Sequence, residues 1–135
     1  MLREVCQYIE NSVAEYILGS ILFHGYRPPS APARCLTLLE RTGPLYDFYV
    51  TGKQDIPIQV LCRSASYDQA LSDARSVVDL LCGTDRAGIT LPVLTSGEAW
   101  VINTAQVISG PAWLGQDTLN RHEFTANILL HSQLN

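Results

Sequence analysis

The chain has 135 residues, of which 16% are charged and 47% hydrophobic, and its formal net charge is −4. This length suits one domain with a single core. The charged fraction lies well below the average of roughly 25%, so either other subunits cover part of the surface or the chain is a compact monomer with a Ser/Thr/Gln-rich surface. The acidic balance and the scattered Lys and Arg residues argue against a dedicated nucleic-acid binder.

The lack of targeting signals and the spacing of the cysteines further limit the class of protein. No apolar run approaches the ~18 residues of a membrane span, and Glu4 and Glu10 interrupt the apolar positions that a signal peptide would need. We therefore expect synthesis in the cytoplasm of the cell that makes the chain, without membrane contact. Four cysteines lie in or beside apolar stretches and show no CxxC spacing: Cys6, Cys35, Cys62 and Cys82. We expect buried thiols, with neither a metal site nor a disulfide framework.

The N-terminal segment predicts an amphipathic helix followed by a break. Apolar residues recur at three-and-four spacing: Leu2, Val5, Cys6, Ile9, Val13, Tyr16 and Ile17. Gly19 is the expected end of this helix, although Ile21 to Phe23 could prolong it. The segment from Gly25 to Pro32 contains three prolines, which predicts a loop or extended arm.

Two strands are expected next. Cys35 to Glu40 is apolar on both faces, which indicates a central or covered strand. A turn at Thr42–Pro44 leads to a second strand from Tyr46 to Val50, and these two strands form a candidate hairpin. Gly52 and Lys53 predict a further turn.

The clearest pattern runs from Ile56 to Gly83. Ile56, Ile58, Val60 and Cys62 alternate with Pro57, Gln59, Leu61 and Arg63, as in a half-buried strand. Ser66 then predicts a helix N-cap, and Gln69 completes a capping box. Asp68 lies in the first turn, where the helix dipole favours a negative charge. One helical face carries Ala70, Ala74, Val77, Val78 and Leu81, and Gly83 is the expected stop.

The C-terminal third predicts strands. Ala99 to Ile108 reads as one or two strands, and Pro111 and Gly115 bracket an irregular stretch around Trp113. His122 to His131 alternates, with Phe124, Ala126, Ile128 and Leu130 on one side. The whole chain is therefore predicted to be one α+β domain, residues 1–135. In it, a mixed, mainly antiparallel sheet packs against two main helices, with a Pro-rich arm at about residues 25–33.

A search for catalytic and cofactor motifs finds none. There is no GxSxG elbow, no GxxxxGK[ST] phosphate loop and no Rossmann glycine spacing, and the three histidines show no ligand spacing. Cys62 and His122 could meet as a nucleophile pair on neighbouring strands, but both occupy inward phases, which a packed core explains better. We expect no catalytic residue, no cofactor and no metal.

Six residues are candidates for contacts between subunits. Gln59, Leu61 and Arg63 share the outward face of one strand, where Leu61 is apolar among polar neighbours; a covering helix is the other explanation for it. Asp117 and Arg121, with Glu123, form the densest polar cluster, either an interface patch or a solvated loop end with a local ion pair. Trp113 is either an anchor of its loop against the core or an exposed contact residue.

Two segments resemble a known family. The first runs from Pro57 to Arg63 and through Ser66–Tyr67–Asp68 to Ala70. The second runs from Gly110 to Asp117 and continues to Asn120–Arg121–His122–Glu123–Phe124 and Asn127. Both are similar to the strand-to-helix core and the closing pattern of tail-terminator and minor capsid proteins of tailed bacteriophages. The order of elements also matches that family, although the Pro-rich arm departs from it.

The resemblance implies a virion or prophage structural protein of the head–tail junction, made in the bacterial host cytoplasm. Such proteins form rings, often hexameric, that cap the tail tube and join it to the head. The implied partners are further copies of the chain, the tail-tube protein and head-completion or neck proteins. DNA would pass through the acidic ring without specific binding. The alternatives are a small α+β enzyme or ligand-binding domain, or a cytosolic adaptor protein.

Overall fold

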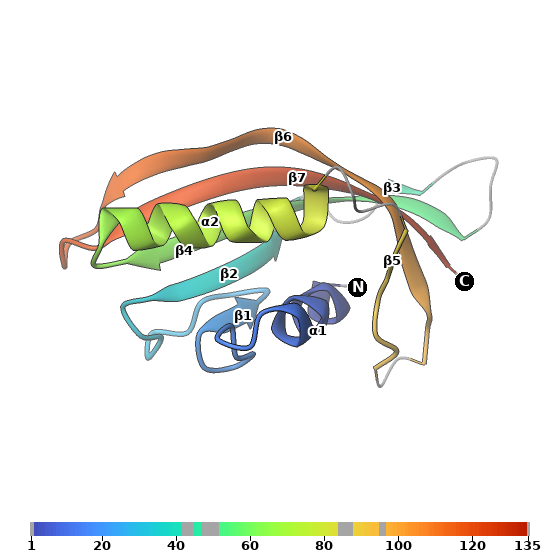
Figure 1. Cartoon of the computed structure of the whole chain (residues 1–135), viewed down its shortest axis with the longest axis horizontal. Coiled ribbons are helices and arrows are strands. Elements are labelled where there is room, and N and C mark those ends of the chain that lie inside the picture. The colour runs from blue at the N-terminus through green and yellow to red at the C-terminus, as the bar shows by residue number, and fades with distance from the viewer. Residues whose placement is uncertain (1, 42–44, 47–51, 84–87, 95–96, 135) are drawn as a thin grey trace.

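The computed structural model describes residues 2–41, 45–46, 52–83, 88–94 and 97–134. Two helices and seven strands follow the order α1 (Leu2–Ser12), β1 (Leu22–His24), β2 (Cys35–Glu40), β3 (Leu45–Tyr46), β4 (Lys53–Ser64), α2 (Tyr67–Cys82), β5 (Ile89–Thr90), β6 (Trp100–Gln116) and β7 (His122–Leu134). This confirms the predicted α+β class (Figure 1).

The strands form one mixed sheet in the order β1-β2-β4-β7-β6-β5, with β3 attached to β4. All its pairs are antiparallel except β1 with β2. The centre is the long pairing of β4 with β7, which runs from Lys53 opposite Gln133 to Ser64 opposite His122. In Figure 1, α2 lies across β4 and β7, and α1 lies beside β1 and β2.

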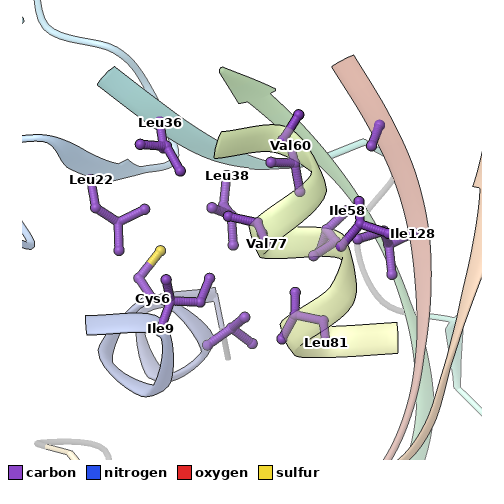
Figure 2. Close-up of a cluster of buried hydrophobic side chains, with 14 of the residues drawn as sticks. Cys6, Ile9, Leu22, Leu36, Leu38, Ile58, Val60, Val77, Leu81 and Ile128 are labelled. Carbon is purple, nitrogen blue, oxygen red and sulfur yellow. The ribbon is translucent and has the colours of Figure 1, made fainter. Parts of the chain in front are cut away.

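Both helices pack on the same face of the sheet. Alternate residues of β4, namely Ile56, Ile58, Val60 and Cys62, are buried there, as the alternation predicts. Figure 2 shows Cys6 and Ile9 of α1 approaching Val77 and Leu81 of α2 among strand side chains. Burying this much apolar surface is the main source of stability. The four predicted inward residues of β7 are buried as well.

The β4–α2 unit matches its prediction apart from two details at the helix ends. The Ser66 side chain accepts a hydrogen bond from the Gln69 backbone N–H, as expected for an N-cap. A capping box also requires the Gln69 side chain to accept from the Ser66 backbone N–H, and this part of the prediction is wrong. The Gln69 side chain donates to Asp73, and the Ser66 N–H donates to the Ser64 hydroxyl. Gly83 does end the helix, but with an extended backbone (φ −62°, ψ 146°).

The N-terminal helix is shorter than its apolar pattern predicts. It ends at Ser12, and the segment around Ile21–Phe23, considered as a prolongation, contributes to strand β1 instead. Tyr16 leaves the helical path to enter the core, where its hydroxyl donates to Asp73 Oδ1 at 2.9 Å. This contact joins residues 57 positions apart, so local periodicity could not reveal it. The segment Gly25–Pro32 is a loop, as predicted.

Two strand predictions are corrected. The predicted hairpin partner pairs with β4 rather than β2, because Leu45 lies opposite Asp55 and Tyr46 opposite Gln54. Lys53 is already part of β4, and residues 42–44 and 47–51 lie outside the described residues. The stretch around Trp113 continues β6, and its irregularity takes the form of register shifts against β7. Gly110, at φ +87°, is required there because a Cβ would collide with the Thr125 carbonyl.

Candidate subunit interface

The sheet face away from the helices carries Gln59 and Leu61. We call this the open face; it consists of the outward residues of β4 and β7, namely Pro57, Gln59, Leu61, Arg63, Glu123, Thr125, Asn127, Leu129 and His131. Most of these side chains are partly exposed. Neither α1 nor α2 packs on this face, so the covering helix considered as an explanation for Leu61 is not one of them.

Side-chain hydrogen bonds run across the open face. Gln59 Nε2 donates to Thr125 Oγ1 at 3.0 Å. Asn127 donates through Nδ2 to Ser109 Oγ at 2.7 Å and accepts from Arg41 Nη1 at 3.0 Å. These cross-strand pairs fix the register and give the face a polar, water-compatible character. Leu61 lies between Thr37 and Thr125 in the ladder and is partly exposed, as are the other two apolar residues of the face, Pro57 and Leu129.

Arg63 belongs to the open face by register but is only 5% exposed. Its guanidinium donates to three backbone carbonyls of the Pro-rich arm: Pro32 at 2.8 Å, Ala33 at 3.2 Å and Ala31 at 3.4 Å. Burial lowers the pKa of Arg63 from its usual value. The Arg63 side chain thus makes its contacts within its own chain, where it holds the arm against the end of the sheet.

Two further arginines fasten the same arm. Near its start, Arg27 Nη1 lies 3.0 Å from Glu123 Oε1. At its end, Arg34 donates twice to the Asp73 carboxylate, at 2.8 and 3.0 Å. Asp73, 1% exposed, also accepts from Tyr16 and Gln69, so its buried charge is fully paired. The arm is therefore attached both to the sheet and to α2.

Asp117 and Arg121 lie in the turn between β6 and β7. The Asp117 carboxylate accepts from the backbone N–H groups of Leu119 and Arg121, both at 2.9 Å, and from Arg121 Nε at 2.7 Å. These hydrogen bonds, that of the Arg121 N–H first, lower the pKa of Asp117. Asn120 completes the turn at φ +60°. The pair is a local ion pair that shapes the turn.

Trp113 is 53% exposed and forms the outer layer of an aromatic cluster. Its ring lies 6.3 Å from that of Tyr67 and 6.2 Å from that of His122, measured between centroids. Tyr67, at the first turn of α2, contacts the buried Phe124 edge-on at 5.0 Å. The cluster holds Trp113 in one orientation while leaving half of its surface free.

The outer edge of β6, beyond the part that pairs with β5, is an exposed feature that was not predicted from the sequence. Strand β5 pairs only with Val101 and Ile102, so among the described residues the outer side of β6 beyond Ile102 has no strand partner. Val107, Ile108 and Leu114 are exposed along it by 39, 57 and 56%. The detectable signal is the absence of any Asp, Glu, Lys or Arg between Glu98 and Asp117.

The six sequence-derived candidates therefore fall into three places. Gln59 and Leu61 lie on the open face. Arg63, Asp117 and Arg121 gather at the end of the sheet crossed by the arm, close enough for Asp117 and Arg121 to influence the pKa of Arg63. Trp113 lies beside the N-terminus of α2.

Cys62 and His122, considered above as a nucleophile pair, are not opposite each other in the β4–β7 ladder. Cys62 lies opposite Phe124 rather than His122, and burial raises the pKa of its thiol well above the usual value. Burial likewise raises the pKa of Cys6 to about 12 and that of Cys82 to about 11, which suppresses the reactive thiolate. All four cysteines are free thiols. In the described part of the chain, no group of three His, Cys, Asp or Glu side chains could hold a metal ion.

No helix among the described residues has the length and apolarity needed to cross a membrane. A search of curated proteins finds no match. A family model described as bacteriophage tail terminator protein matches residues 11–133, which include every strand up to β7 and the whole of α2. This match covers both segments on which the resemblance was based. The chain belongs to the bacteriophage tail terminator family and is thus a structural protein of the phage tail.

Proposed function

We propose that copies of this chain assemble into a ring that caps the tail tube and joins it to the head. Six copies is the number that the family resemblance implies. Family membership supplies the role in the tail. The task is non-catalytic: subunits must bind one another, bind the last layer of the tube and present a surface to the neck or head-completion proteins.

The observation that carries the proposal is the uncharged outer edge of β6. Natural monomers protect long edge strands with charges, covering segments or bulges. This edge has bulges, yet Val107, Ile108 and Leu114 are exposed along it, and the polar residues among them, such as Gln106 and Ser109, carry no charge. The sequence lacks Asp, Glu, Lys and Arg from Ala99 to Gln116. Several large apolar side chains exposed along one uncharged strand favour a protein–protein contact. A ring subunit would cover it in the assembled state.

The open face provides a second type of surface. Its hydrogen-bonded amides and hydroxyls, with Leu61 in the middle, resemble the partly polar composition of contacts between separately folded proteins. We assign this face to a partner other than the neighbouring copy, either the tail tube or the neck. The net charge of −4 would repel DNA phosphates, so DNA would pass through the ring without specific binding.

The proposal is tested with the purified chain and the tail-tube protein encoded by the same genome. Light scattering after size exclusion should give the mass of several copies, alone or after the tube protein is added. Electron micrographs of polymerising tubes should show shorter tubes with capped ends when the chain is present. A monomer at high concentration that binds no tail component and leaves tube length unchanged would overturn the proposal.

A further inference from the structure

Two exposed features lie at opposite edges of the sheet, since β1 and β6 are separated by β2, β4 and β7. On the β6 side, we define the apolar edge as Val107, Ile108, Trp113 and Leu114. On the β1 side there is a cavity of about 370 Å³ between the start of α1, strand β1 and the start of the arm. We call it the β1 hollow; its lining is Arg3, Leu18, Gly19, Leu22, Phe23, His24, Tyr26 and Pro28.

The β1 hollow has the character of a receptor for a large apolar side chain. Its volume lies at the low end of the roughly 300–1,000 Å³ of small-molecule pockets, which suits one or two side chains rather than a folded element. Leu18 and Phe23 are partly exposed in the lining, and Tyr26, 70% exposed, offers an aromatic ring. The lining contains no carboxylate, and Arg3 is its single Lys or Arg.

The apolar edge is suited to side-chain docking rather than to strand addition. Pro111 lacks the N–H needed for a ladder hydrogen bond, and register shifts against β7 at Ile102/Thr104, Val107/Ser109, Ser109/Ala112 and Trp113/Gly115 disturb its regular spacing. Trp113, by contrast, is oriented by Tyr67 and His122, and such preorganisation lowers the entropic cost of binding. Trp is also among the commonest hot-spot residues at interfaces.

We propose that Trp113, together with Leu114, docks into the β1 hollow of a second copy of this chain. The inference rests on the proposed ring and assigns the contact between its neighbours. A ring requires each subunit to present two different, complementary surfaces, so that each copy binds the next head to tail. An exposed apolar edge and a hollow lined mainly by uncharged residues, at opposite sheet edges, meet this requirement, whereas pairing of β6 with β6 would close a two-fold dimer.

The charges beside the two features are complementary. Arg3 lines the hollow and is exposed, and Asp68, also exposed, directly follows the Tyr67 that contacts Trp113. A cation on one side and an anion on the other favour the head-to-tail orientation and disfavour a two-fold contact that brings Asp68 against its own copy.

A photo-crosslinking amino acid in place of Leu114, which leaves Trp113 intact, tests the contact in the full chain mixed with the tail-tube protein. Irradiation should yield a crosslinked dimer, and mass spectrometry should place the crosslink within residues 18–28. Crosslinks to residues 100–116 of another copy would indicate two-fold pairing of β6. Crosslinks to the tail-tube protein would assign the apolar edge to the tube. Either outcome would overturn the inference while leaving the ring intact.

Substitutions on both edges provide a second readout. Trp113→Ala should weaken assembly about 30-fold or more, as for a typical hot-spot residue. Tyr26→Glu should have a similar effect from the other side. Val93→Ala, at a comparably exposed apolar residue (57%), is the matched control and should assemble normally. Circular dichroism should show the folded spectrum for all three variants, since each residue is exposed.

A charge exchange separates the contact from nonspecific effects. Arg3→Asp and Asp68→Arg should each weaken assembly, and the double variant should regain part of the loss. If the ring forms in the wild type but is insensitive to Trp113→Ala and Tyr26→Glu, only this inference fails. If the wild type assembles neither alone nor with the tube protein, the ring itself fails and this inference fails with it.

Discussion

Strands β4 and β6 belong to the same sheet but use their apolar residues differently. In β4, alternate side chains from Ile56 to Cys62 are at most 1% exposed, and both edges of the strand are paired. Strand β6 is longer, yet Ile102 is its one fully buried side chain among the described residues. Strand β7 pairs with both strands, so sharing a partner does not give β4 and β6 the same side-chain burial.

The difference indicates two kinds of apolar residue. Those of β4 are buried under α2 and stabilise the fold of the single chain. Those of β6, such as Ile108 and Leu114, remain in solvent and contribute little to that fold. In the proposed ring, a neighbouring copy covers these side chains. Stability measurements on the isolated chain and assembly measurements should therefore separate the two strands.

The largest expected effect is the loss of stability when a β4 core residue is truncated. Ile58→Ala should lower the free energy of unfolding by about 2–5 kcal/mol, because it removes buried methyl groups and leaves a cavity. Ile108→Ala, which truncates the same side chain on β6, should change it by about 0.5 kcal/mol or less. Urea denaturation of both variants at a concentration where the chain is monomeric measures the contrast. Similar losses for the two would break the comparison.

A medium effect is expected where β4 holds the Pro-rich arm. Arg63→Met keeps the apolar stem but leaves the carbonyls of Ala31, Pro32 and Ala33 without their donor, so it should cost about 1.5–3 kcal/mol. Release of the arm should also expose the peptide bond after Arg34 to trypsin.

The matched control for this prediction is Arg41→Met. Arg41 is exposed and bonds Asn127 on the open face, so its loss should cost less than about 1 kcal/mol. Urea denaturation and the rate of trypsin cleavage after Arg34 measure both variants. An Arg63→Met variant as stable and as protease-resistant as the wild type would show that β4 does not depend on the arm.

The smallest effect concerns the turn that ends β6. The pKa of Asp117 is lowered in the folded chain, so its ionised form contributes stability that is complete above about pH 5 and is lost as the pH falls below about 4. Asp117→Asn should therefore be less stable than the wild type at pH 7, and the difference should shrink in acid. Thr118→Ala, in the same turn, is the control. Thermal unfolding from pH 3 to pH 7 measures this, and a difference independent of pH would contradict it.

The sequence predicted best the elements whose stability is local or regularly buried. The alternation of β4, the Ser66 cap and the apolar face of α2 all agree with one another, and the structure confirms them. The end of α1 and the length of β6 could not be predicted in the same way. Tyr16 leaves its helix for a distant carboxylate, and the register shifts of β6 interrupt the two-residue period on which strand prediction depends.

The site was less predictable than the fold, for a related reason. Gln59 and Leu61 follow from the period of β4, and Trp113 could be singled out by its residue type. The role of Arg63 depends on where the arm crosses the sheet, which is a long-range property. Asp73 could have been singled out from the sequence, because a carboxylate beside Ala74 on the buried face of α2 requires a partner. The uncharged run from Ala99 to Gln116 was another such signal.

The position of β7 between β4 and β6 has a consequence for the timing of synthesis. Strand β4 leaves the ribosome before its partner, by 58 residues at the Ser64–His122 pair and by 80 at the Lys53–Gln133 pair. At typical elongation rates of 5–20 residues per second, the delay is about 3 to 16 seconds. During this interval α2 can already cover one face of β4, while the edge reserved for β7 stays open. The nascent chain thus carries a central strand with one unpaired edge until β7 has been synthesised.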